Sequence, residues 1–311
     1  ECDMWWGTLG TVRPFSNFNP EQDAMEIQAA LEKKDAVTLL SILTNRSNEQ
    51  RQVVAKTFQD LTRKDLAAGL KKALAGDLET LLLELLTPPL QYEAQRLQQA
   101  MAGIGTDEDS LLEILCTRSG KQLKEISAAY EQVYQKELEK EVKGETSGDF
   151  AKLLVALLNV IYLICDCVLL CQSFQYLVSS MNGKKANAGP WIEILTSRDS
   201  DHLNDVLLGL ELATGQMVEQ LLEKSFSGDI RLGLTVLVKC IQDPYHYLAQ
   251  RLTIKKTPIV QGIMVSHSEE DLLCIRAAYL KLTGTSLYTA LQKQFKGDHL
   301  QALLAICRSE D

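Results

Sequence analysis

The chain has 311 residues, of which 46% are apolar and 23% are charged, and this balance is typical of a globular protein rather than of a disordered chain. Good helix formers such as Leu, Ala, Glu, Gln and Lys dominate and only 7 prolines occur, so we expect an all-α fold. The formal net charge of −9 disfavours binding to nucleic acid, and contact with an anionic membrane would need a bridging cation or a local basic patch.

One sequence pattern of about 70 residues occurs four times along the chain. Residues 41–86 align with residues 113–158 without a gap, and the same pattern returns at 193–238 and 262–307. Within each copy, apolar residues recur at intervals of three and four, which is typical of short amphipathic helices. A single copy leaves an apolar face exposed, so the sequence predicts four homologous repeats that pack together.

The predicted organisation follows these copies in chain order. The boundaries are an N-terminal tail at 1–20, repeat 1 at 21–88, repeat 2 at 89–158, an anomalous apolar linker at 159–175, repeat 3 at 176–241 and repeat 4 at 242–311. The linker belongs to an apolar run, residues 153–171, whose length approaches that of a membrane span. Three alternatives are open for it: a buried or irregular linker helix, an error in the gene model, and a true membrane span.

Repeat 2 contains a loop with two glycines, residues 101–108 (MAGIGTDE), between two predicted helices. Gly103 and Gly105 can adopt positive φ, so the backbone can aim several carbonyl groups at one point. Calcium takes six to eight oxygen ligands, and such a group of carbonyls suits it. A carboxylate is still needed for charge. Glu145 lies in the second loop of the same repeat, which the helical hairpin would bring close to the first loop.

The GxGTD loop, the IL-x-x-RS segment, the acidic residue before SGDF and the fourfold repeat together resemble the annexin family. The resemblance covers about residues 7–157 and 190–311, and residues 43–52 and 103–111 are close to the family consensus. It implies about five helices in each repeat and a curved disc that binds calcium on its convex face. Ca²⁺ as a cofactor, an anionic phospholipid membrane as a partner, and a cytoplasmic location with reversible peripheral membrane association are implied as well.

The same resemblance implies calcium ligands at three places. The principal site would consist of the backbone carbonyls of Met101, Gly103 and Gly105 with the carboxylate of Glu145. A weaker site would use the Thr106 carbonyl and Glu108. A low-affinity site in repeat 1 would use the carbonyls of Lys71 and Leu74 with Glu79. One carboxylate and three carbonyls leave calcium coordination unfilled, so water or a lipid phosphate would complete the principal site.

The other three repeats depart from this pattern. The position of Glu145 is occupied by Ala73 in repeat 1, Ser225 in repeat 3 and Gln294 in repeat 4, so we expect no principal site there. Their first loops carry lysine pairs instead: Lys33 and Lys34, Lys184 and Lys185, and Lys255 and Lys256. Two interpretations are open. The lysines are simply solvated, or they attract anionic headgroups without calcium.

No sequence motif of nucleophilic, nucleotide-binding or zinc-dependent catalysis occurs, so we expect no enzyme. The sequence favours calcium-dependent binding to anionic phospholipid, mainly through repeat 2. The alternative is a calcium-independent scaffold or protein-interaction module with the same fold. The N-terminal tail is a candidate site for a protein partner.

Overall fold

The structure is a computed structural model that describes residues 9–160, 167–181 and 186–308. These residues form 20 helices and no strand, which confirms the predicted all-α fold. The chain divides into two compact units. Unit 1 consists of Glu1–Tyr92 and Leu248–Asp311, and unit 2 consists of Glu93–Tyr247. Repeats 1 and 4 therefore lie in unit 1, and repeats 2 and 3 lie in unit 2.

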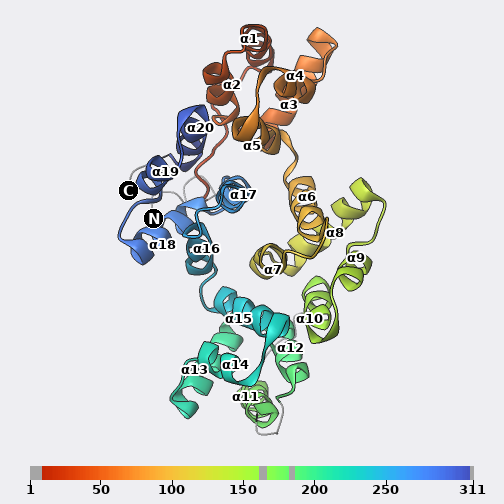
Figure 1. Cartoon of the computed structure of the whole chain (residues 1–311), viewed down its shortest axis with the longest axis vertical. Coiled ribbons are helices and arrows are strands. Elements are labelled where there is room, and N and C mark those ends of the chain that lie inside the picture. Colours follow the sequence, from red (N-terminus) through yellow and green to blue (C-terminus); the bar gives the residue numbers. More distant parts are fainter. Residues whose placement is uncertain (1–8, 161–166, 182–185, 309–311) are drawn as a thin grey trace. The chain divides into compact units, whose positions relative to one another are not determined.

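Each repeat contains five helices, labelled in Figure 1. Repeat 1 has α1 (Pro20–Lys33), α2 (Ala36–Leu43), α3 (Asn48–Thr62), α4 (Leu66–Ala73) and α5 (Gly76–Leu86). Repeat 2 has α6 (Pro89–Met101), α7 (Glu108–Thr117), α8 (Gly120–Tyr134), α9 (Leu138–Glu145) and α10 (Gly148–Leu158). Repeat 3 has α11 (Cys167–Met181), α12 (Ala188–Ser197), α13 (Ser200–Thr214), α14 (Val218–Ser225) and α15 (Gly228–Gln242). Repeat 4 has α16 (Pro244–Leu252), α17 (Thr257–His267), α18 (Leu272–Thr283), α19 (Leu287–Gln294) and α20 (Gly297–Cys307).

The backbone repeats in detail as well as in helix order. The fifth helix of every repeat begins with a glycine of positive φ: Gly76 (68°), Gly148 (61°), Gly228 (66°) and Gly297 (67°). The third helix of every repeat ends at a left-handed residue: Arg63, Gln135, Gly215 and Gly284. The start of the third helix is also set locally in repeats 1 and 2, because Ser47 and Ser119 each form a capping box with the glutamine three residues later. The four copies therefore share one local structure.

In unit 1, helices from the two ends of the chain form a common core. Helix α20 packs against α2, α5 and α17, and α17 also contacts α5 (Figure 1). These four helices carry fully buried apolar side chains, including Leu39, Leu82, Ile263 and Leu303. Burying a Leu or Ile side chain contributes about 1.5–3 kcal/mol, so this shared core is the main force that joins repeats 1 and 4.

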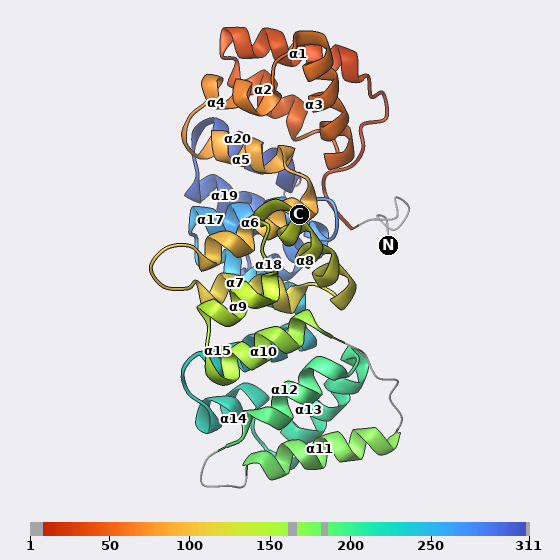
Figure 2. The ribbon, with the colours of Figure 1, turned by 90° about the vertical axis from the view of Figure 1, so that its right-hand side faces the viewer.

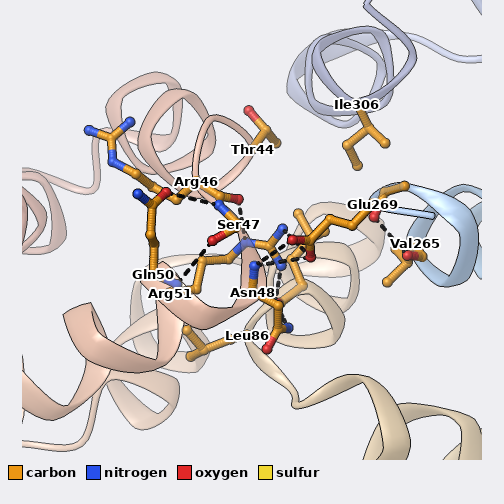
Figure 3. A network of polar contacts seen from close by, with 12 residues as sticks. Thr44, Arg46, Ser47, Asn48, Gln50, Arg51, Leu86, Val265, Glu269 and Ile306 are labelled. Carbon is orange, nitrogen blue, oxygen red and sulfur yellow. Dashed lines mark hydrogen bonds and ion pairs between the residues drawn. The ribbon is translucent and has the colours of Figure 1, made fainter. Parts of the chain in front are cut away.

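A polar network also links repeats 1 and 4 (Figure 3). The buried guanidinium of Arg51 donates to the Leu85 carbonyl, and its Nε donates to the Arg46 carbonyl at 3.1 Å. Its Nη2 lies 3.9 Å from Oε2 of Glu269, and the Asn48 backbone N–H donates to both Glu269 carboxylate oxygens at 3.1 and 3.0 Å. Burial raises the pKa of Glu269, whereas the Arg51 charge and the Asn48 N–H lower it.

The segment before α1 is bound to repeat 4. The Thr11 N–H and the Val12 N–H donate to the Ser268 carbonyl, and the Thr11 hydroxyl donates to the Ile306 carbonyl at 2.6 Å. A Cβ on Gly10 would lie only 2.3 Å from the backbone of repeat 4, so only glycine allows this close approach. The part of the predicted tail that follows residue 8 is therefore ordered on the protein, and residues 1–8 lie outside the described residues.

In unit 2, α10 and α15 pack against each other and against α7 and α12. The approach of α15 to α10 is close, because a Cβ on Gly233 would lie 2.6 Å from Leu153 and 3.2 Å from Phe150. The first helix of repeat 3, α11, begins at Cys167, so the later part of the predicted linker at 159–175 is helical. Ser173 and Leu177 are four residues apart and both buried, as expected for one face of a helix. Within the described ranges, no helix is both long and apolar enough to cross a bilayer.

An arginine–carboxylate pair locks the first helix of repeat 1 to the turn before the third. Arg46 donates from Nε and Nη2 to the two carboxylate oxygens of Asp23 at 2.7 and 2.8 Å, and both side chains are buried. In repeat 4 the arginine position is His267, whose Nδ1 lies 2.7 Å from the Asp271 carboxylate. Arg198 of repeat 3 forms no ion pair with any residue that the structure describes.

Candidate calcium site

The loop between α6 and α7 is open and shaped by its two glycines. Gly103 has φ of +92° and Gly105 has φ of +88°, values that residues with a Cβ rarely adopt. The Asp107 N–H donates to the Ala100 carbonyl at 2.8 Å and closes the loop at its base. The loop extends away from the helices of unit 2 (Figure 2). Both glycines therefore have the positive φ that their lack of a Cβ allows.

A hydrogen bond ties this loop to the end of α9. The Thr106 hydroxyl donates to the carbonyl of Glu145 at 3.2 Å, although the two residues are 39 positions apart. Glu145 is the last residue of α9 and is exposed. Its carboxylate forms no hydrogen bond or ion pair with the residues that the structure describes. The structure therefore brings the two predicted parts of the principal site together and leaves the acidic group available for a ligand.

No lysine or arginine among the described residues forms an ion pair with the Glu145 carboxylate. Lys143, the nearest lysine along α9, forms an ion pair with Glu139 at 2.5 Å. Tyr130 lies beneath the site, and its pKa is raised to about 12 by burial first and then by the charge of Glu141, with a smaller effect of Glu145. Its hydroxyl therefore stays neutral at physiological pH. The local field is negative and favours a cation.

The donors at this place fit calcium. Among the described residues, no group of three or more His, Cys, Asp or Glu side chains could hold a metal ion. A metal at the α6–α7 loop would bind through backbone carbonyls and the Glu145 carboxylate. Hard oxygen ligands of this kind favour calcium over zinc or copper, which prefer nitrogen and sulfur. The open loop leaves room for water or an external oxygen ligand.

For the two predicted weaker sites, the structure gives the positions of the residues along their helices and no contact that joins them. Glu108 is the first residue of α7 and is partly buried, two residues after Thr106. In repeat 1, Lys71 lies in the last turn of α4, Leu74 caps that helix and Glu79 lies in the first turn of α5. Both sites stay predictions.

In repeat 4 a side-chain amide uses a loop carbonyl that a metal would need. Gln294 occupies the position of Glu145, and its Nε2 donates to the Lys255 carbonyl at 2.5 Å. Lys255 itself has a positive φ of 60°, so the loop keeps the left-handed turn without a glycine. An amide N–H and a cation compete for the same oxygen lone pairs. The contact gives a physical reason to expect no principal calcium site in repeat 4.

The predicted lipid-binding lysines are exposed where the structure describes them. Lys33 and Lys34 lie at the end of α1, and Lys255 and Lys256 lie before α17. None of the four forms an ion pair with a described residue. The remaining pair falls in the loop at 182–185, which lies outside the described residues, as do Lys184 and Lys185 themselves.

Ile104 is a feature of the loop that the sequence reasoning missed. Its side chain lies between the two glycines and is fully exposed. A large apolar side chain at a loop tip is costly in water and favourable in a lipid interface. The signal in the sequence was an apolar residue flanked by two glycines, because such a residue has no neighbours to cover it.

Comparisons with known proteins show the family and the fold of this chain. A sequence model of the Annexin family matches residues 22–85, 92–157 and 253–306. Annexin A9 of Mus musculus is 37% identical to this chain over 318 residues, which cover 98% of this chain and 92% of the mouse protein. The solved structure of annexin III is similar with a TM-score of 0.94 and 36% identity, covering 99% of this chain and 100% of that one. Chicken annexin V is similar with a TM-score of 0.88 and 34% identity, covering 97% and 99%.

Proposed function

The chain belongs to the annexin family, and from that premise we propose that it binds anionic phospholipid membranes through calcium held mainly by repeat 2. Calcium and phospholipid binding are characteristic of annexins. The observation that carries the proposal is that the Thr106 hydroxyl donates to the Glu145 backbone carbonyl, which ties the two-glycine loop to the residue whose carboxylate is exposed and unpaired among the described residues. The carbonyls of Met101, Gly103 and Gly105 would supply the other protein oxygens.

The proposal accounts for the net charge of the protein. A chain with a formal charge of −9 is repelled by an anionic membrane unless a cation lies between them. Calcium bound by one carboxylate keeps positive charge and open coordination, which a lipid phosphate can fill. Each ligand then strengthens the binding of the other by the same factor. Exposed Ile104 would add apolar contact with the lipid interface.

The proposed role is binding without catalysis. Membrane association would be peripheral, and it would be reversible because a calcium bridge dissociates when the calcium concentration falls. The proposed location is cytoplasmic. One strong site gives a shallow calcium dependence, since several coupled sites are needed for a steep one. We therefore expect a Hill coefficient near 1 for calcium-dependent binding.

Co-sedimentation with vesicles of phosphatidylserine and phosphatidylcholine tests the proposal. The wild-type protein should bind in calcium and be released by a chelator. Glu145→Gln keeps the size of the side chain but removes its charge, and it should raise the calcium requirement by at least about tenfold, since even supporting groups around a metal change affinity by about 10–100-fold. A suitable control is Glu125→Gln on α8, which removes an equal charge from an exposed pair with Lys121.

The outcomes separate the two candidate functions. A calcium requirement raised by Glu145→Gln and unchanged by Glu125→Gln supports binding through repeat 2. Calcium dependence that survives Glu145→Gln places the metal elsewhere and refutes the assignment to repeat 2. Vesicle binding that ignores both calcium and the substitution supports the alternative, a calcium-independent scaffold or interaction module.

We further propose that Lys33, Lys34, Lys255 and Lys256 attract anionic headgroups without calcium. All four are exposed and unpaired among the described residues, and each lysine near an anionic surface contributes about 1 kcal/mol. Binding to the same vesicles in a chelator should then appear at low ionic strength and vanish as salt is added. No binding at low salt would contradict this part of the proposal.

A further inference from the structure

Repeat 1 contains a pocket between the end of α1 and the start of α4. Its volume is about 520 Å³, within the range of small-molecule sites. Leu31, Phe58 and Ala73 are among its apolar lining residues, and Lys34, Lys64 and Lys72 also line it. The pocket therefore combines an apolar interior with cationic side chains.

Two side chains of repeat 2 have smaller counterparts in repeat 1. With the shift of 72 residues between the repeats, Gly69 corresponds to Glu141 and Thr62 corresponds to Tyr134. In repeat 2 the Tyr134 ring packs on Tyr130 with centroids 4.9 Å apart. Repeat 1 has only a threonine and a glycine at the two positions. Of these two positions, Gly69 lines the pocket of repeat 1 and adds no carboxylate to it.

The same comparison shows which charge is missing. In repeat 2, Lys136 Nζ pairs with Glu141 Oε2 at 3.2 Å, and the Glu141 charge raises the pKa of Tyr130 after burial does. The counterpart of Lys136 in repeat 1 is Lys64, and the counterpart of Glu141 has no side chain. Lys64 consequently forms no ion pair with a described residue. In repeat 2, therefore, a carboxylate lies beside the lysine, and in repeat 1 the equivalent lysine has no such carboxylate.

Two acidic residues also line the pocket, and they do not neutralise the lysines. Asp65 accepts the Ala68 N–H at 2.9 Å as the N-cap of α4, so its charge is directed at the start of that helix. Glu32 is exposed and forms no ion pair among the described residues. With three lysines against these two acids, an added anion meets a net positive surface, while the apolar interior favours a hydrocarbon body.

We propose that this pocket binds a monomeric amphiphile with a carboxylate head and a hydrocarbon chain. The head takes the place of the Glu141 carboxylate beside Lys64 and is within reach of Lys72. The hydrocarbon chain lies against Phe58 and Leu31, which line the apolar part of the pocket. Binding requires no calcium, so it is independent of the proposed function of repeat 2.

Titration of the full-length protein with decanoate, in a calcium chelator and below the micelle concentration, tests the proposal. Isothermal titration calorimetry should show saturable binding of one decanoate. Decylammonium carries the same chain with the opposite charge, and acetate carries the charge without the chain, so neither should bind measurably. Equal binding of decanoate and decylammonium overturns the proposal, and so does saturable binding to anionic vesicles without binding of decanoate.

Two variants locate the binding site. Gly69→Glu places a carboxylate at the position of Glu141 in repeat 2 and should abolish decanoate binding. Its Cβ would lie 2.9 Å from Cδ1 of Leu31, a flexible side chain at the pocket that can shift to make room. The double variant Lys64→Gln, Lys72→Gln changes exposed, unpaired side chains, so its fold is kept, and it should weaken binding about fivefold to tenfold, as expected for two exposed ion pairs. Calcium-dependent vesicle binding checks that both variants are folded. Decanoate binding that is unchanged in either variant refutes the proposed site.

Discussion

Replacing Gly105 by alanine tests whether the shape of the α6–α7 loop creates the calcium site. Gly105 has φ of +88°, and a Cβ added there would meet nothing within 4 Å, so backbone strain is the whole cost of the substitution. Strain of this kind is about 1–3 kcal/mol. Because the loop is exposed, the variant can relax to a negative φ without calcium and must return to the strained form to bind it. The calcium affinity should then fall by about 5-fold to about 150-fold.

Calcium titration of vesicle binding measures this effect, and Gly144→Ala is the matched control. Gly144 lies next to Glu145 within α9, has an ordinary helical φ, and also has open space around an added Cβ. Alanine stabilises a helix relative to glycine by about 0.5–1 kcal/mol, so this variant should bind calcium as well as the wild type and be slightly more stable. If Gly105→Ala keeps the wild-type calcium requirement, the loop conformation does not limit binding and the reasoning fails.

Two further predictions concern unit 1. Asp23→Asn leaves the buried Arg46 guanidinium without a counter-charge and should destabilise unit 1 by about 3–5 kcal/mol; hydrogen exchange of the α1 and α3 amides would show it, and unchanged exchange would contradict a stabilising ion pair. The pKa of Glu269 is raised from 4.5, mainly by burial, so the folded state holds this proton more tightly than the unfolded chain does. The contribution of Glu269 to stability should therefore fall as pH rises from 4.5 through the raised pKa, and Glu269→Gln should flatten the melting temperature over that interval, whereas parallel profiles for the two proteins would argue against it.

The repetition of the sequence predicted the fold because the signals that set it are local. Helix caps such as Ser47 and Ser119, and the glycines that begin each fifth helix, act within a few residues. The loop could likewise be predicted from the conformational freedom of Gly103 and Gly105 alone. Glu145 was found by its spacing from the loop, and the structure places its carbonyl beside Thr106. Local rules and one fixed spacing were enough to predict the loop and its proximity to the end of α9, whereas the calcium ligands themselves stay a prediction.

The features that the sequence did not predict depend on contacts between distant residues. The Gln294 amide bound to the Lys255 carbonyl joins two loops whose exact register no pattern reveals. The pocket of repeat 1 is lined by residues of α1, α3 and α4, which come together only in the folded structure. Helix α11 begins within the predicted linker. The sequence did not predict this start, because an apolar run can belong to a helix or to a linker and periodicity alone does not distinguish the two.

The division of the chain into two units has a consequence for its synthesis. Unit 2 is one continuous stretch, Glu93–Tyr247, whereas unit 1 joins Glu1–Tyr92 to Leu248–Asp311. The ribosome delivers the residues in order, at about 5–20 per second, so unit 2 is complete before the C-terminal part of unit 1 exists. Repeat 1 must wait with the apolar surfaces of α2 and α5 uncovered until α17 and α20 emerge. Repeat 1 is therefore the part of the nascent chain whose apolar surface stays exposed, and open to aggregation, for the longest time.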